Sequence, residues 1–130
     1  MDSVISTPEL KALIDARNTL RNKDENEEYV LIDVRRDDEL KNGMIPTARH
    51  LPLIELEEAF SLSSSDFQNR YGFEKPTQKS LIIVYCRTGG RSHSACDILL
   101  RKGYSAKNYK GSIWEWSEID STVKRYGLFQ

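Results

Sequence analysis

The segment from Leu81 to Ser92 joins an apolar run to one cysteine and a turn rich in glycine and arginine. The run is short and rich in β-branched residues, as is typical of a strand buried on both faces, and Cys86 follows it directly. Arg87 and Arg91 carry permanent positive charge, so a thiol near them ionises more readily, and a thiolate is a nucleophile. The segment therefore predicts a cysteine nucleophile in an anion-binding turn.

A helix is expected directly after this turn, with Ser92 as its N-cap and Gly103 at its end. The first turn of a helix offers free N–H groups and the positive end of the helix dipole, which favour an anion or a thiolate. Glycines without a Cβ let successive amides turn toward one point. The expected cradle consists of the nucleophile and the six residues after it: Cys86, Arg87, Thr88, Gly89, Gly90, Arg91 and Ser92.

The spacing within this turn separates two chemistries. Cysteine phosphatases enclose a phosphate with the pattern C-x5-R, whereas Cys86 and Arg91 are spaced C-x4-R. The shorter loop suits one extra sulfur atom on Cys86, a persulfide, better than a phosphate with all its oxygens bound. A buried cysteine that happens to end a strand is the structural alternative, but it leaves the glycines and arginines unexplained.

At this point the sequence resembles the rhodanese family of sulfurtransferases, whose active-site loop begins with the catalytic cysteine and runs into a helix. The strand that ends in Asp-Val-Arg at 33–35, followed by Glu39 and Gly43, resembles the first signature of that family. The segment YKGSIWEW at 109–116 resembles the second. Three positions depart from the family pattern: Met44 replaces the common histidine, Thr47 the glycine of a Pro-Gly-Ala turn, and Ser112 the second glycine of the second signature.

The resemblance implies a thiosulfate sulfurtransferase with a persulfide mechanism. The Cys86 thiolate takes the outer sulfur of thiosulfate or a related donor, releases sulfite, and passes the sulfur to an acceptor such as cyanide, glutathione, thioredoxin or another thiol. Arg87, Arg91 and the loop amides would hold the donor, and the resemblance implies no metal and no organic cofactor. Asp33 and Arg35 are expected to support the loop; a local ion pair at the strand exit is the alternative.

Two other functions remain open at this point. One is a cysteine phosphatase or arsenate reductase on the same fold, which hydrolysis of an aryl phosphate would indicate. The other is a regulatory binding module without catalysis, which would leave Cys86 unmodified by every sulfur donor. The presence of Cys86 argues against the binding module, and the C-x4-R spacing argues against the phosphatase.

Length and composition predict one domain over residues 1–130, since 38% hydrophobic residues suffice for one compact core. The net charge of −1 argues against a nucleic-acid binder, and no apolar tract is long enough to span a membrane. The first nine residues lack the pattern of a secretory signal. We expect an intracellular protein, with the cytoplasm as the first choice and the mitochondrion as the alternative. Cys96 is expected to pack in the core, and no cysteine and histidine spacing indicates zinc.

The remaining chain alternates short apolar runs with helical patterns. This alternation predicts an α/β fold, a single rhodanese-like domain whose central parallel sheet of about five strands has helices on both faces. Ligands of such sheets bind beyond the carboxyl ends of the strands, where Asp33 and Cys86 are expected. Strands are expected at 3–6, 29–34, 48–51, 81–85 and 106–109, a polar loop at 22–28, and helices from 7 onward and near 54–60, 66–71, 92–102, 113–119 and 121–126.

Overall fold

The computed structural model describes residues 3–19 and 29–125. Within them, four parallel strands form one sheet in the order β2-β1-β3-β4. The strands are β1 (Val30–Asp33), β2 (Arg49–His50), β3 (Leu81–Tyr85) and β4 (Ser105–Asn108). In the centre of the sheet Ile32 is paired with Val84, and Asp33 with Tyr85. This register brings the ends of β1 and β3 to one edge, so that Asp33 and Cys86 lie at the same end of the sheet, as expected.

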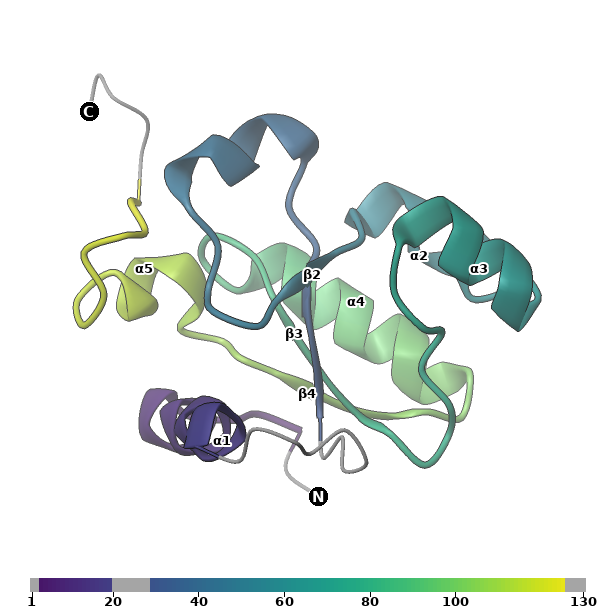
Figure 1. Cartoon of the computed structure of the whole chain (residues 1–130), viewed down its shortest axis with the longest axis horizontal. Helices are drawn as coiled ribbons and strands as arrows, with labels where there is room; N and C mark the ends of the chain where they lie inside the picture. The colour runs from purple at the N-terminus through teal and green to yellow at the C-terminus, as the bar shows by residue number, and fades with distance from the viewer. Residues whose placement is uncertain (1–2, 20–28, 126–130) are drawn as a thin grey trace.

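Alternate residues of the central strands face opposite sides of the sheet, and each side has its own core. Ile32, Ile82 and Val84 pack under α4 (Gly90–Arg101), α2 (Leu56–Ala59) and α3 (Ser64–Tyr71). Leu31 and Ile83 pack on the other side with α1 (Thr7–Thr19) and α5 (Ser112–Trp116). Figure 1 shows these two helical layers on either side of the strands. The predicted α/β fold with helices on both faces is confirmed.

The sheet has four strands, close to the expected number of about five. Residues 3–6 contribute one isolated bridge, in which Val4 pairs with Asn108 in parallel. The reason lies in the next residues: the Ser6 amide donates to the Glu9 carboxylate at 2.9 Å, and the Leu10 amide donates to the Ser6 carbonyl at 3.0 Å. Because α1 begins so soon, too little extended chain remains to form a strand.

Several predicted elements have different boundaries. Helix α4 begins at Gly90, with Gly89 as its N-cap, so the predicted cap Ser92 lies inside the first turn. The helix expected near 54–60 consists of the 3-10 helix η3 (Leu53–Glu55) and α2. A further 3-10 helix, η2 (Asp37–Asn42), follows β1. No helix is present over 121–125, and residue 126 and the predicted loop at 22–28 lie outside the described residues.

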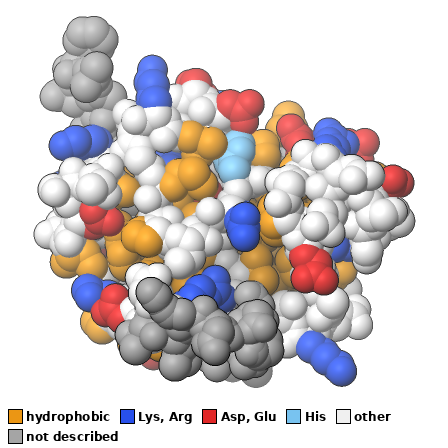
Figure 2. All heavy atoms as spheres, viewed as in Figure 1, with side chains coloured by type: hydrophobic (Ala, Val, Ile, Leu, Met, Phe, Trp, Pro, Cys, Tyr) orange, Lys and Arg blue, Asp and Glu red, His pale blue; other side chains and the backbone are white. Residues whose placement is uncertain are grey.

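The surface carries charges of both signs. On the face that Figure 2 shows, Lys and Arg side chains alternate with Asp and Glu, and they do not gather into one basic patch. Across residues 3–19 and 29–125, no helix is both long and apolar enough to cross a membrane.

Candidate active site

Cys86 directly follows β3 and lies at the start of a tight turn into α4, with only 1% of its surface exposed. Its Sγ accepts a hydrogen bond from the Gly89 amide at 3.1 Å and lies 3.5 Å from the Ser92 Oγ. Burial by itself raises the pKa of the thiol. Hydrogen bonds from the Ser92 hydroxyl and from the amides of Ser92, Gly89 and Thr88 outweigh that effect, and the pKa lies below its usual value. The turn therefore stabilises a thiolate.

The first turn of α5 anchors the start of this cradle. The Cys86 amide donates to the Ser112 Oγ at 3.1 Å, and the Ile113 amide donates to the Cys86 carbonyl at 3.1 Å. The Trp114 amide donates to the Arg87 carbonyl at 3.0 Å. These bonds direct the carbonyls of the first two cradle residues toward α5, so that later amides are left to face the sulfur.

Gly89 has the conformation that the cradle requires. Its φ is +101°, a left-handed value that residues other than glycine rarely adopt. A Cβ at this position would lie 2.5 Å from the Lys110 carbonyl oxygen. The Asn108 side chain donates to the Gly89 carbonyl at 3.4 Å. Gly90 differs, because its φ is not positive and a Cβ on it would meet open space. Of the two glycines expected to shape the cradle, the backbone geometry requires one.

Arg91 lies in the first turn of α4 and is held by a carboxylate from η2. Its Nη1 and Nη2 donate to the two carboxylate oxygens of Glu39 at 2.7 and 2.9 Å. Glu39 is 13% exposed at its side chain and also accepts the Arg36 amide at 2.9 Å. The Arg91 hydrogen bonds, partly opposed by burial, lower the pKa of Glu39 to about 2. The cation that was expected to meet the donor is therefore already paired.

Arg87 points to the side of the cradle that faces α5. Its guanidinium lies 5.5 Å from the centre of the Trp114 ring and donates to the Arg125 carbonyl at 3.0 Å. The guanidinium of Arg125 lies 4.5 Å from the same ring. Trp116, two residues further on, packs in the core against Tyr109. Of the two tryptophans, Trp114 is thus the one at the edge of the site.

Asp33 and Arg35 form a buried ion pair at the end of β1. Arg35 donates to the Asp33 carboxylate through Nε at 2.9 Å and Nη2 at 2.7 Å. The same guanidinium donates to the carbonyl of Glu39, within η2, at 3.3 Å and to that of Gly43, directly after η2, at 2.8 Å. Among the described residues, no hydrogen bond joins Asp33 to a cradle amide. The ion pair thus fixes the backbone of the segment that carries Glu39, and Glu39 in turn binds Arg91.

A groove of about 630 Å³ lies beside the cradle. Its lining includes Thr88 of the cradle, Trp114 of α5 and the segment before α1. The charged side chains that line it are Lys110 and Glu115, and Glu115 accepts a hydrogen bond from the Thr7 hydroxyl. The full lining comprises Val4, Ile5, Ser6, Thr88, Lys110, Gly111, Trp114 and Glu115.

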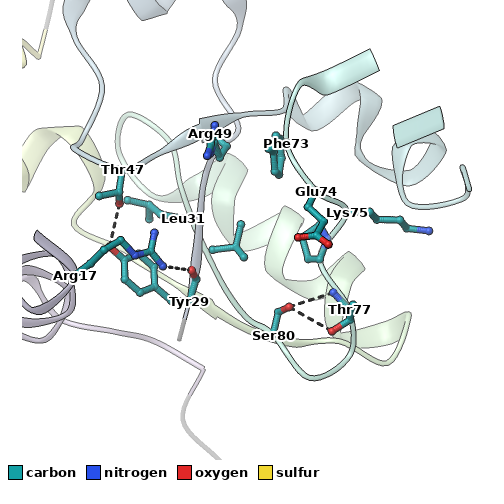
Figure 3. Close-up of a pocket in the computed structure, with 12 residues that line it drawn as sticks. Arg17, Tyr29, Leu31, Thr47, Arg49, Phe73, Glu74, Lys75, Thr77 and Ser80 are labelled. Atoms are coloured by element: carbon teal, nitrogen blue, oxygen red, sulfur yellow. Dashed lines mark hydrogen bonds between the residues drawn. The ribbon is translucent and has the colours of Figure 1, made fainter. Parts of the chain in front are cut away.

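A second cavity, of about 370 Å³, lies at the amino ends of the strands, away from Cys86. In Figure 3 the Arg17 guanidinium covers the Tyr29 ring, and the Tyr29 hydroxyl is hydrogen-bonded to Thr47. This cavity contains none of the predicted site residues.

The second thiol, Cys96, is buried in the core as expected. Burial raises its pKa to about 11, so it is far less reactive than Cys86 near neutral pH. Within the part of the chain that the structure describes, no cluster of three or more His, Cys, Asp or Glu side chains is placed to bind a metal.

Three residues at the site had no role in the sequence-based prediction: Glu39, Asn108 and Ser112. The family resemblance had marked the positions of Glu39 and Ser112 without a partner for either. Asn108 had no sequence signal, because an asparagine at the end of a short strand is also common at turns.

The sequence and the fold of this chain are similar to those of known proteins. A family model described as a rhodanese-like domain matches residues 6–119. A putative mitochondrial thiosulfate sulfurtransferase of Schizosaccharomyces pombe is 50% identical over 90 residues, which cover 68% of this chain and 63% of that protein. The chain therefore spans less than two thirds of the length of that relative.

A curated human relative and a solved human structure match over more of the chain. A thiosulfate:glutathione sulfurtransferase is 34% identical over 119 residues, 90% of this chain and 95% of that protein. The solved structure of the human single-domain sulfurtransferase TSTD1 superposes with a TM-score of 0.80 at 31% identity, covering 92% of this chain and 99% of that one.

Proposed function

Because the chain belongs to the rhodanese-like domain family, we propose that it is a sulfurtransferase in which Cys86 carries the transferred sulfur. The observation that supports this most directly is the Cys86 Sγ held at 3.1 Å from the Gly89 amide, with its pKa below the usual value. A thiolate in a ring of amides is stabilised as a nucleophile, and the same amides stabilise an added sulfur anion.

The first half-reaction loads the cysteine. The Cys86 thiolate attacks the outer sulfur of thiosulfate, a new S–S bond forms, and the S–S bond of the donor breaks with its electron pair going to sulfite. The product is a Cys86 persulfide anion, which the amides that stabilise the thiolate, those of Thr88, Gly89 and Ser92, can also stabilise. Arg87, Arg91 and the Asp33–Arg35 pair support this arrangement and are not themselves nucleophiles.

The second half-reaction removes the transferred sulfur from Cys86. An acceptor thiolate or cyanide attacks the outer sulfur of the persulfide and restores the Cys86 thiolate. We propose a thiol acceptor of the glutathione or thioredoxin type, and the groove beside Thr88 is a suitable approach for it. Lys110 at the groove can pair with the carboxylate of a peptide thiol, and Trp114 offers an apolar wall. We propose an intracellular location, with the cytoplasm as the first choice and the mitochondrion as the alternative.

The test is intact-protein mass spectrometry after incubation with thiosulfate. The native chain is expected to gain one sulfur atom, which cyanide removes, and the Cys86→Ser variant is expected to gain none. No gain with thiosulfate, an organic thiosulfonate or a thiol persulfide would reject the proposal. Hydrolysis of an aryl phosphate by the same preparation would then favour a phosphatase.

A further inference from the structure

Two arginines on the η2 side of the cradle, Arg91 and Arg36, are paired with carboxylates. Arg91 makes two charge-assisted hydrogen bonds to Glu39, at 2.7 and 2.9 Å. Arg36, the residue directly before η2, pairs with Asp38 at 3.0 Å and lies 3.9 Å from Glu39. The local sum of these side-chain charges is therefore close to zero, although two arginines are present.

Arg91 nevertheless lies close enough to the nucleophile to interact with it. It is the second residue of α4, and the N-cap of that helix, Gly89, donates to the Cys86 Sγ. The pKa of Arg91 is raised first by its hydrogen bond to Glu39, against an opposing effect of burial, and then by the charges of Glu39, Cys86 and Asp33. A donor that approaches Cys86 from this side thus meets Arg91 with its positive charge neutralised by Glu39.

We propose that Glu39 determines donor specificity: by neutralising Arg91, it lowers the preference of the cradle for dianionic thiosulfate over donors of lower charge, such as thiosulfonates and thiol persulfides. This inference rests on the proposed sulfurtransferase function. Glu39 is neither nucleophile nor base in it, and it acts on the donor through Arg91.

The most direct test compares two donors with the same reacting bond. Thiosulfate and methanethiosulfonate both carry an outer sulfur on an oxidised sulfur. Thiosulfate has two negative charges, whereas methanethiosulfonate has one. Sulfur transfer from thiosulfate releases sulfite, and transfer from methanethiosulfonate releases methanesulfinate. In both cases the same S–S bond to Cys86 forms. The ratio of kcat/KM for thiosulfate to that for methanethiosulfonate therefore reports the effect of donor charge and cancels defects common to both.

Glu39→Gln keeps the shape and one acceptor for Arg91 but removes the negative charge. At low salt the ratio is expected to rise about two- to fivefold, the size that one added charge gives across several ångströms of a hydrated site. High salt should reduce the gain. Glu39→Asp, which keeps the charge, should stay near the native ratio. Arg91→Gln, which leaves Glu39 unneutralised, should lower the ratio by a similar factor.

A second measurement does not depend on sulfur transfer. Iodoacetate and iodoacetamide alkylate the same thiolate, but the first is an anion and the second is neutral, so the ratio of their rates cancels changes in thiolate fraction. Mass mapping of the Cys86 peptide confines the readout to that residue. Glu39→Gln should raise the iodoacetate to iodoacetamide ratio about two- to fivefold, and Arg91→Gln should lower it.

The outcomes separate the two proposals. If the native chain takes up no sulfur but the alkylation ratios shift as expected, the sulfurtransferase function fails and the neutralisation of Arg91 by Glu39 stands. If Glu39→Gln is folded by circular dichroism and leaves both ratios unchanged or lowered, Glu39 does not control donor charge preference. Should Glu39→Gln fail to fold, unchanged ratios in Arg91→Gln would overturn the proposal, because they would show that the charges of this pair do not act on the donor.

Discussion

The backbone amide of Cys86 donates a hydrogen bond to the Ser112 hydroxyl at 3.1 Å, and that hydroxyl donates in turn to the Tyr109 carbonyl at 2.8 Å. The amide of the nucleophile is thus directed to α5 and away from the sulfur cradle. Ser112 lies where the family commonly has glycine, and its φ of +53° retains a glycine-like backbone. A hydroxyl at this position gives the chain a contact that a glycine cannot make.

Replacing Ser112 by glycine should destabilise the protein. The change removes the acceptor of a buried amide, at a cost of about 1–3 kcal/mol, while a positive φ remains easy for glycine. Ser112→Ala removes the same acceptor and keeps a Cβ at positive φ, so it should be no more stable than the glycine variant. Urea denaturation measures both, and a native-like midpoint in both variants would show that water or a backbone shift replaces the hydroxyl.

Gly89→Ala should abolish sulfur loading of Cys86. Its Cβ would lie 2.5 Å from the Lys110 carbonyl oxygen at a φ of +101°, so the turn must move and the amide that bonds Sγ moves with it. Gly90→Ala is the matched control, because open space surrounds its Cβ, and it should load sulfur at a rate within about twofold of native. Equal loading of the two variants would contradict the role of the Gly89 amide.

Ser92→Ala should raise the pKa of the Cys86 thiol. The buried Ser92 hydroxyl is one of the groups that lower this pKa against the opposing effect of burial, so its removal favours the protonated thiol. The midpoint of iodoacetamide alkylation against pH should therefore move to higher pH. Ser94→Ala, an exposed position on the same helix, serves as the control and should leave the midpoint in place.

The Glu39–Arg91 pair should make stability depend on pH in the acid range. Because the pKa of Glu39 falls from 4.5 to about 2 in the folded protein, its contribution is fully present above about pH 5 and is lost as the pH falls toward about 2. With Arg91 32% exposed, screening reduces this contribution to about 1–2 kcal/mol.

Urea denaturation of the native chain and of Glu39→Gln measures this contribution. The native chain should be more stable by that amount at pH 6, and the two should converge near pH 2. Glu57→Gln, an exposed change in α2, should show no comparable difference. A gap between native and Glu39→Gln that stays constant from pH 6 to pH 2 would mean that ionisation of Glu39 does not contribute to folding.

The strands and the nucleophile were predictable because their signals are local. The apolar run 81–85 matches β3 residue for residue, and Cys86 lies at its end as expected. The second strand was placed within one residue at each end. Such runs have few alternatives once their length excludes a helix and their neighbours are polar or glycine.

Other features depended on contacts between distant segments, which spacing does not encode. The pairing of Arg91 with Glu39 joins residues 52 positions apart, so the arginine appeared available to the donor in the sequence. Ser92 appeared to be a helix cap because its type suits that position, but Gly89 is the N-cap. The Ser92 hydroxyl instead lies 3.5 Å from Sγ and donates to the Gly89 carbonyl at 3.2 Å. The extent of the single domain over 1–130 and the roles of the cradle residues stay predictions.

Both departures from the glycines of the family pattern retain the glycine-like backbone. Thr47 has φ +75° and Ser112 has φ +53°, the two positive values outside glycine among the described residues. Each hydroxyl makes a hydrogen bond, Thr47 to the Tyr29 hydroxyl and Ser112 to the Tyr109 carbonyl. The sequence showed a threonine and a serine at glycine positions without indicating their backbone conformation, so the retained turns and the side-chain bonds that accompany them needed the structure.

The position of Trp114 between two guanidinium groups has an optical consequence. Arg87 and Arg125 lie 5.5 and 4.5 Å from its ring, and Arg87 is also part of the cradle. A cation near an indole ring perturbs its excited state, so a shift of Arg87 on the addition of sulfur to Cys86 would change the emission of Trp114. Trp116 is buried against Tyr109 and supplies a constant background. We therefore expect the intrinsic fluorescence of Trp114 to follow sulfur loading in real time, without a dye or a coupled assay.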